Sequence, residues 1–99
     1  MKAVIITGAS SGIGKALCQC YAKNGYFVFG SVRNYKDAKI MDEILGENGQ
    51  AIIFDVTKKD QIKKAYKKIL QKTSSVDILI NNAGIALPSP LEITSNKNF

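Results

Sequence analysis

The 99-residue sequence contains no histidine and no tryptophan, and it has only two cysteines and two prolines. Without histidine the chain has almost no ligands for zinc, so no metal site is expected. The two cysteines, Cys18 and Cys20, would point about 200° apart on a helix, so a disulfide between them is not expected either. This cysteine pattern favours a cytoplasmic location. No run of about 18 apolar residues occurs, so no membrane-spanning helix is expected.

Acidic residues are also scarce, since 8 acids against 14 lysines and arginines give a net charge of +6. One segment, residues 58–72, accounts for the whole excess. It holds a single acid, Asp60, and seven lysines: Lys58, Lys59, Lys63, Lys64, Lys67, Lys68 and Lys72. Apolar residues such as Ile62 and Ile69 recur among them at helical spacing, which predicts one amphipathic helix with a solvated basic face. No aromatic residue interleaves with the lysines on that face, so we expect no nucleic-acid partner.

Two kinds of hydrophobic pattern alternate along the chain. Short apolar runs, typical of strands buried on both faces, cover residues 2–7, 26–32, 50–54 and 76–80. Helical spacing occurs between them, over residues 12–24, 35–45 and 58–72. For the last helix we expect a start resembling a capping box, formed by Thr57 and Asp60. Strands that alternate with helices of this length need crossover connections, so the sequence predicts an α/β fold with a parallel sheet.

The segment TGASSGIG, residues 7–14, joins the first predicted strand to the first predicted helix. In a parallel α/β sheet this turn lies at the carboxyl ends of the strands, where dinucleotides bind. Gly8 would permit the tight turn, Gly12 would let the backbone approach a pyrophosphate, and Gly14 would let the helix pack close to the strand. Free N–H groups at the helix start would then meet the negative charge. The alternative is a glycine-rich turn that binds nothing.

Three further motifs accompany the pattern T-G-x-x-x-G-I-G. Asn81-Asn82-Ala83-Gly84 follows the fourth predicted strand, Asp55-Val56 follows the third, and the sequence LPSPLE comes after the asparagine motif. With these motifs, the chain resembles the N-terminal half of a short-chain dehydrogenase/reductase. The resemblance implies a partial Rossmann-type sheet, β-α-β-α-β-α-β, with strand order 3-2-1-4. Right-handed crossovers would put the first two helices on one face and the lysine-rich helix on the other.

The resemblance also implies which residues bind the cofactor. The expected set is Gly8, Ser10, Ser11, Gly12, Ile13, Gly14, Arg33, Asp55, Val56, Asn81, Ala83 and Gly84. The glycine loop would line the pyrophosphate and the adenosine ribose, and the asparagine motif would flank the adenosine and steady the centre of the sheet. Asp55 would accept a hydrogen bond from the adenine amino group, while the N–H of Val56 would contact the ring. Two alternatives stay open, namely that Asp55 is a turn residue before Thr57 and that the asparagines are ordinary strand-end turn residues.

The end of the second strand bears on which nicotinamide cofactor is used. In the family that the chain resembles, NAD-specific members place an acid there to bind the ribose 2′-hydroxyl. Here that position is Val32, the next residue is Arg33, the only arginine, and the nearest acid, Asp37, falls inside the following helix. A guanidinium can bind a 2′-phosphate through two N–H groups, whereas a carboxylate would repel it. We therefore expect NADP(H) rather than NAD(H), the alternative being that Arg33 is a solvated loop charge.

The catalytic residues that the resemblance implies, a Ser and a Tyr-x-x-x-Lys, would come after residue 99. One match to the second motif occurs, Tyr35-x-x-x-Lys39, but it falls on the adenosine side of the expected site, so no catalytic residue is expected in this chain. We interpret the chain as the NADP(H)-binding portion of an oxidoreductase that acts on an alcohol or carbonyl, inactive by itself. The alternative is a truncated, non-catalytic nucleotide-binding or interaction module.

Residues 1–99 are thus expected to be one half of a single Rossmann domain. Residues 1–82 would form the core, and residues 83–99 would form a loop leading to a missing fourth helix. In the complete fold a fifth strand would pair with residues 76–80. Here that strand would be an apolar edge with unpaired N–H and C=O groups, so we expect homo-oligomers or self-association through it.

Overall fold

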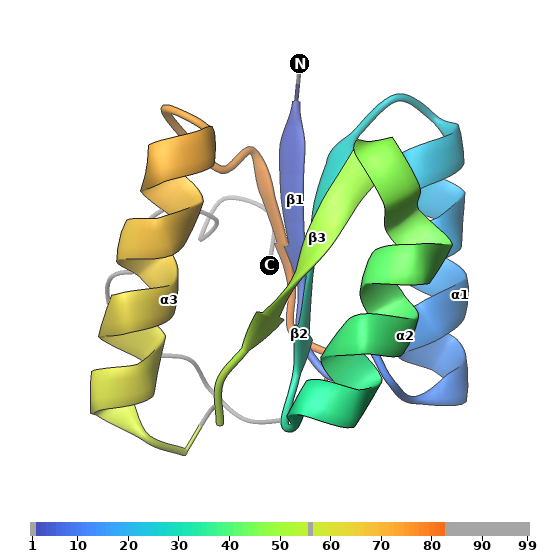
Figure 1. The fold of residues 1–99 in the computed structure, drawn as a ribbon. Coiled ribbons are helices and arrows are strands. Elements are labelled where there is room, and N and C mark those ends of the chain that lie inside the picture. The colour runs from blue at the N-terminus through green and yellow to red at the C-terminus, as the bar shows by residue number, and fades with distance from the viewer. Residues whose placement is uncertain (1, 56, 83–99) are drawn as a thin grey trace.

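Four parallel strands and three α-helices alternate in the structure, a computed structural model that describes residues 2–55 and 57–82 (Figure 1). The strands are β1 (Ala3–Ile6), β2 (Phe27–Val32), β3 (Gly49–Ile53) and β4 (Ile78–Ile80). The helices are α1 (Gly12–Lys23), α2 (Tyr35–Leu45) and α3 (Lys59–Lys72), and a short 3₁₀ helix, η1 (Gly46–Asn48), joins α2 to β3. The strand order is β3-β2-β1-β4 with every pairing parallel, which confirms the predicted fold class.

Different helices cover the two faces of this sheet. Successive side chains of a strand point to opposite faces, so Ile5 and Phe29 pack in one cluster with α3, while Val4 and Val28 pack in another with α1 and α2. Figure 1 shows α1 and α2 on one side of the sheet and α3 alone on the other. Burial on both faces explains why the two central strands, β1 and β2, are almost entirely apolar. The predicted division of the helices between the faces is confirmed.

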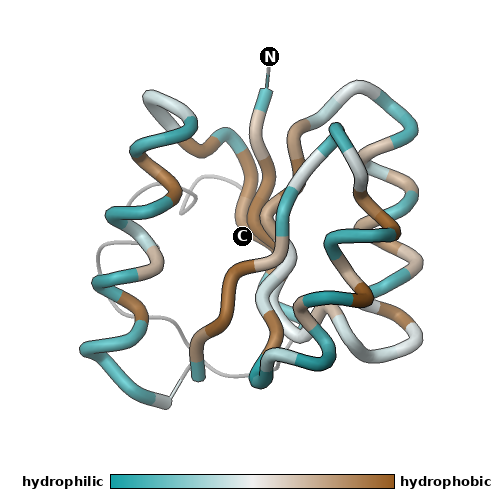
Figure 2. Tube along the Cα trace, in the orientation of Figure 1, coloured by the Kyte–Doolittle hydropathy of each residue, from teal (hydrophilic) through white to brown (hydrophobic). Residues whose placement is uncertain are grey.

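Helix α3 carries the lysine-rich segment with its apolar side turned to the sheet. Ile62, Ala65 and Ile69 are buried in the core cluster on this face. Hydrophilic residues recur along the rest of the helix in the trace coloured by hydropathy (Figure 2). The alternation is the one that the spacing of apolar residues predicts. None of the described helices, α3 included, is long and apolar enough to cross a bilayer.

The start of α3 differs from the capping box predicted at Thr57 and Asp60. The N-cap is Lys58, and its side chain makes no capping hydrogen bond among the described residues. Thr57 instead donates its hydroxyl to Oδ1 of Asp55, at 2.7 Å. The helix begins one residue later than the predicted box requires, so Gln61, not Asp60, is the third helical residue. The carboxylate of Asp55 therefore competed successfully for the hydroxyl that the predicted cap would have used.

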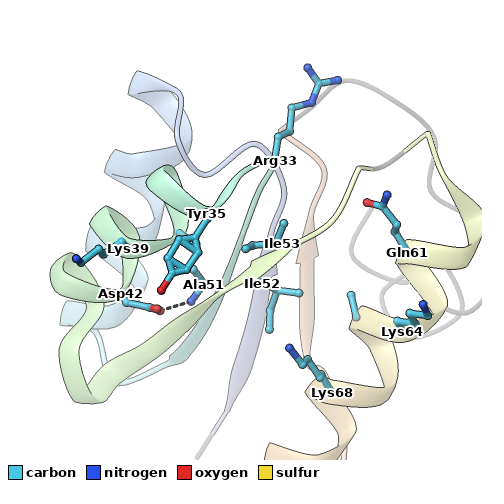
Figure 3. Close-up of a pocket in the computed structure, with 12 residues that line it drawn as sticks. Arg33, Tyr35, Lys39, Asp42, Ala51, Ile52, Ile53, Gln61, Lys64 and Lys68 are labelled. Atoms are coloured by element: carbon cyan, nitrogen blue, oxygen red, sulfur yellow. Dashed lines mark hydrogen bonds between the residues drawn. The ribbon is translucent and has the colours of Figure 1, made fainter.

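Side chains from both neighbouring helices close the outer edge of β3. The N–H of Ala51 donates to Oδ1 of Asp42 on α2, at 2.7 Å (Figure 3). Just beyond the strand, the N–H of Asp55 donates to Oε1 of Gln61 on α3, at 2.8 Å. Between these two residues, the N–H of Phe54 points the other way and donates to β2. The two side chains therefore occupy outward N–H groups that an added strand would use.

The two cysteines of α1 lie in different environments. Cys18 is buried in the core and Cys20 is exposed, and both are free thiols. Burial raises the pKa of Cys18 to about 11, because a poorly solvated site disfavours the thiolate. We predict that an alkylating reagent at pH 8 modifies Cys20 in the folded protein and leaves Cys18 unmodified, while both react in concentrated urea. Fragment-ion mass spectrometry of the peptide that contains both residues would locate the label.

The same pKa predicts how stability responds to alkaline pH. Unfolded Cys18 loses its proton near pH 9, whereas folded Cys18 keeps it until about pH 11. The contribution of the buried thiol to the free energy of unfolding is therefore complete below pH 9 and is lost as pH rises through 11. Modification of Cys18 in the folded protein at the rate of Cys20 would contradict this account.

Candidate functional site

The glycine loop runs from the end of β1 into the start of α1 and is fastened to β2. Gly8 has φ of 64°, a left-handed conformation that glycine adopts without a steric penalty. Its N–H donates to the Ser31 hydroxyl at 3.3 Å, and the N–H of Ala9 donates to the Ser31 carbonyl at 2.9 Å. Ser31 is buried in β2. The turn that was predicted at Gly8 is therefore present, and a neighbouring strand fixes its position.

Ser11 closes the loop and begins helix α1. Its hydroxyl donates to the Gly8 carbonyl at 2.9 Å and accepts from the N–H of Gly14 at 3.0 Å, which makes it the N-cap. The N–H of Ser11 also donates to the Gly8 carbonyl, at 3.2 Å. Both polar groups of Ser11 that could donate to a ligand are thus engaged inside the loop. Its geometry is that of a residue that shapes the loop.

The two glycines at the start of α1 have different surroundings. A Cβ on Gly14 would overlap the carbonyl oxygen of Gly8 and come within 2.9 Å of Nδ2 of Asn82. The close approach that was predicted at Gly14 is therefore made to the loop itself and to the end of β4. Among the described residues, a Cβ on Gly12 would meet nothing within 4 Å, and Gly12 does not have positive φ. The packing of residues 2–55 and 57–82 therefore gives no reason for a glycine at position 12.

The asparagines after β4 are joined to the glycine loop by side-chain hydrogen bonds. Nδ2 of Asn82 donates to the Gly8 carbonyl at 3.2 Å and to the Ser11 hydroxyl at 3.0 Å. The hydroxyl of Thr7, which is buried, donates to Oδ1 of Asn81 at 3.1 Å. Two motifs more than seventy positions apart therefore form one structural unit at the carboxyl ends of β1 and β4.

Asp55 lies at the same end of the sheet, just after β3, and is fixed on several sides. Oδ1 accepts from the N–H of Thr57 at 2.9 Å and from its hydroxyl at 2.7 Å, and the Asp55 carbonyl accepts from the N–H of Lys58 at 2.9 Å. The Thr57 bonds, helped by the charges of Arg33 and Lys58, lower the pKa of Asp55, so the carboxylate stays ionised at neutral pH. The turn role left open in the sequence is therefore real, but it uses only Oδ1. Oδ2 has no hydrogen-bond partner among the described residues.

Arg33 follows β2 directly, is exposed, and extends away from the body of the sheet (Figure 3). It lies at one end of a groove of about 610 Å³ that runs along β3 between α2 and α3. Tyr35 and Lys39 line the same groove, on the outer side of β3, and not the glycine loop. The nearest acid, Asp37, is engaged within the first turn of α2, where Asn34 donates to its carboxylate at 3.1 Å. No acid therefore occupies the end of β2, as the sequence predicted.

The accessible surface of the loop suits an anionic ligand with an extended shape. Ser10 and Gly12 are exposed, and Ile13 leaves 71% of its surface exposed at the first turn of α1. The positive end of the α1 dipole and its first N–H groups point toward this surface. The open space over Gly12 lets a phosphate approach the backbone, so the residues present fit a dinucleotide. Among residues 2–55 and 57–82, no cluster of three or more His, Cys, Asp or Glu side chains could hold a metal.

Of the predicted site residues, the structure brings together the glycine loop and Asn81, and it places Arg33 and Asp55 on the same end of the sheet. Val56, Ala83 and Gly84 lie outside the described residues. Sequence reasoning missed the supporting residues Thr7, Ser31 and Asn82. The predicted strand order could have indicated them. It places β1 between β2, which carries Ser31, and β4, which Asn82 follows, so the carboxyl ends of both strands lie beside the glycine loop.

A sequence model of the short chain dehydrogenase family matches residues 2–99 of the chain. The chain belongs to this family. It is 37% identical over 94 residues to the NADPH-dependent 3-dehydrocapnine reductase of Ornithobacterium rhinotracheale, and the matched region covers 93% of this chain and 33% of that relative. It is 39% identical over 84 residues to the 3-oxoacyl-[acyl-carrier-protein] reductase FabG of Vibrio cholerae, and the matched region covers 85% of this chain and 34% of that relative.

Solved structures of this family contain the same fold. A short-chain dehydrogenase/reductase family oxidoreductase from Aeromonas hydrophila superposes with a TM-score of 0.79 at 23% identity, over 87% of this chain and 41% of that one. A short-chain dehydrogenase from Streptomyces avermitilis gives 0.75 at 32% identity, over 84% of this chain and 30% of that one. The short-chain dehydrogenase chain described here spans about a third of the length of the curated relatives it matches.

Proposed function

We propose that the chain supplies the cofactor-binding half of an NADP(H)-dependent oxidoreductase that acts on an alcohol or carbonyl. The observation that carries the proposal is the open space over Gly12, where the packing of the described residues does not require a glycine. A pyrophosphate that approaches the backbone at the start of α1 gives that glycine a reason. The relatives named as reductases support the class of reaction.

Each part of the site has a role in this proposal. The exposed residues Ser10, Gly12 and Ile13 contact the pyrophosphate and the adenosine ribose, while Ser11 and Gly14 hold the loop in shape. Oδ2 of Asp55 accepts a hydrogen bond from the adenine amino group, and Oδ1 keeps its bonds to Thr57. Asn81 fixes the end of β4 beside the loop through Thr7. We keep Val56, Ala83 and Gly84 as proposed adenosine contacts from the family motif. The nicotinamide, when bound, supplies or accepts the hydride.

Arg33 is proposed to select NADP(H) over NAD(H). It is exposed at the carboxyl end of β2, and its charge contributes to the lowered pKa of Asp55. The acid that would bind a 2′-hydroxyl is absent from the end of β2, and Asp37 is engaged with Asn34 inside α2. A guanidinium in this place can pair with a 2′-phosphate through two N–H groups. One of the relatives is named as NADPH-dependent, in agreement with this choice.

Replacing Arg33 with Ala tests this choice. We expect the Kd for NADPH to rise about tenfold or more, since charge-assisted hydrogen bonds contribute about 1.5–3 kcal/mol, while the Kd for NADH stays within about twofold. Fluorescence titration of both cofactors would measure the ratio. The matched control is Lys72→Ala, which removes a positive charge from the last residue of α3, at the end of the sheet opposite Arg33. An unchanged ratio in Arg33→Ala would remove Arg33 from the site.

Two further features are proposed from the sequence. We place the protein in the cytoplasm, because its two cysteines are free and one is exposed.

We also propose self-association through the edge of β4. The other edge of the described sheet, at β3, has outward N–H groups at Ala51 and Asp55 bonded to side chains, so it is the poorer of the two for pairing.

A further inference from the structure

Gln61 is on α3, outside the glycine loop, and its side chain bonds one of the proposed cofactor contacts. We infer that Gln61 is a positioning residue for the adenine, acting through the backbone of Asp55. Its Oε1 accepts from the N–H of Asp55 at 2.8 Å, and this fixes the residue whose Oδ2 is left for the ligand. The inference rests on the proposed function, because it concerns the proposed contact between Asp55 and the adenine.

The bond joins the end of β3 to the first turn of α3. Gln61 is the third residue of α3, and a glutamine there often reaches back to the N–H of the N-cap residue. Here it reaches three residues further, past Lys58, to the N–H of Asp55. Helix α3 is anchored to the sheet by Ile62, the next residue, which is buried in the core. The first turn of α3 is therefore a rigid support for the end of β3.

Asp55 needs such a support because its other bonds are local. Thr57 and Lys58, which bond its carboxylate and its carbonyl, are only two and three residues away in the chain. Those bonds set the shape of the turn and reach no further than Lys58, the N-cap of α3. The preceding N–H, that of Phe54, donates to β2 at 3.0 Å and is the last such bond before Asp55. Beyond it, the bond to Gln61 joins the Asp55 backbone to a residue inside α3.

Fixing an acceptor before the ligand arrives strengthens binding, because the ligand does not have to order it. With Gln61 in place, the turn presents one ionised oxygen, Oδ2, in a defined position. Without an acceptor at position 61, the N–H of Asp55 turns to water and the strand end gains freedom. The adenosine half of the cofactor then binds more weakly, while the chemical step, which takes place at the nicotinamide, keeps its rate.

The test measures adenosine-side binding in the full chain carrying Gln61→Met, which keeps the length of the side chain and removes the acceptor. Adenosine 2′,5′-bisphosphate and NADPH are the probes. We expect the Kd of both to rise about fivefold, the effect of losing one ordinary hydrogen bond. Gln61→Glu keeps an acceptor and should stay within about twofold. Gln71→Ala, on the exposed side of the same helix, is the matched control.

A double-mutant cycle separates positioning from a general effect on the fold. In an Asp55→Ala background, Gln61→Met should weaken binding no further, because the carboxylate that it positions is gone. Where turnover is measurable, Gln61→Met should raise the KM for NADPH and leave kcat unchanged. Independent, additive losses in the cycle, or unchanged binding in Gln61→Met, would overturn this inference alone. Failure of the unsubstituted protein to bind either probe would overturn the proposed function, and this inference with it.

Discussion

Alanine at position 14 is expected to destabilise the protein by about 3 kcal/mol or more, a large part of the stability of a small domain. The added Cβ would overlap the carbonyl oxygen of Gly8, a backbone atom held by bonds from Ser11 and Asn82. A flexible side chain could move aside, but this carbonyl cannot move without breaking those bonds. The loop and the first turn of α1 would have to separate, and the buried face of α1 would shift with them.

Urea unfolding followed by far-ultraviolet circular dichroism would measure the effect of Gly14→Ala. Gly12→Ala, two residues earlier in the same helix, is the control, because a Cβ there meets nothing within 4 Å. We expect that control to unfold at the same urea concentration as the unsubstituted protein or slightly above it, since alanine favours a helix over glycine. A Gly14→Ala midpoint equal to that of the control would mean that the loop is looser than described.

Valine at position 12 is expected to reduce NADPH binding by about a hundredfold while leaving the fold intact. In the unliganded protein the Cβ of the valine would have none of the described residues within 4 Å, so the side chain would start in open space. In the complex it would fill the space through which the pyrophosphate approaches the N–H groups of α1. Losing the contacts between a phosphate and a helix start in this way costs about 2–3 kcal/mol, the value of charged hydrogen bonds.

Calorimetric titration with NADPH, paired with urea unfolding of the same samples, separates these two effects for Gly12→Val. The expected combination is normal stability and very weak binding, the reverse of what a packing defect produces. Binding within about twofold of the unsubstituted protein would show that the pyrophosphate does not pass over Gly12.

Much of the fold could be predicted because its signals are local. The apolar runs that became β1 and β2 are buried on both faces, and the stops at Asn24-Gly25 and Gly46 coincide with observed helix ends. β4 is shorter than predicted, at residues 78–80 rather than 76–80, although the N–H of Asp77 still donates to the Ala3 carbonyl at 3.0 Å. Strand ends depend on pairing partners, which hydrophobic spacing does not specify.

The supporting bonds of the site could not be predicted in the same way. Asn82 and Ser31 reach the loop from other strands, and such contacts depend on side-chain directions that only the folded sheet determines. The predicted start of α3 was wrong for a related reason. Asp55 and Thr57 bond each other, and Gln61 occupies the third helical position, where Asp60 was expected. Local competition among several polar side chains decides a helix start, and a capping pattern considers only two of them.

The proposed function depends on the glycine loop binding the pyrophosphate of NADP(H). The most direct measurement is a titration of isotope-labelled protein with NADP⁺, followed by the backbone amide resonances. We expect saturable shifts at Ser10, Gly12 and Ile13 and at Asp55, with no shift at Gly25 or Thr73, which lie at the opposite end of the sheet. If saturating NADP⁺ leaves the loop resonances unmoved, the glycine loop does not bind the pyrophosphate.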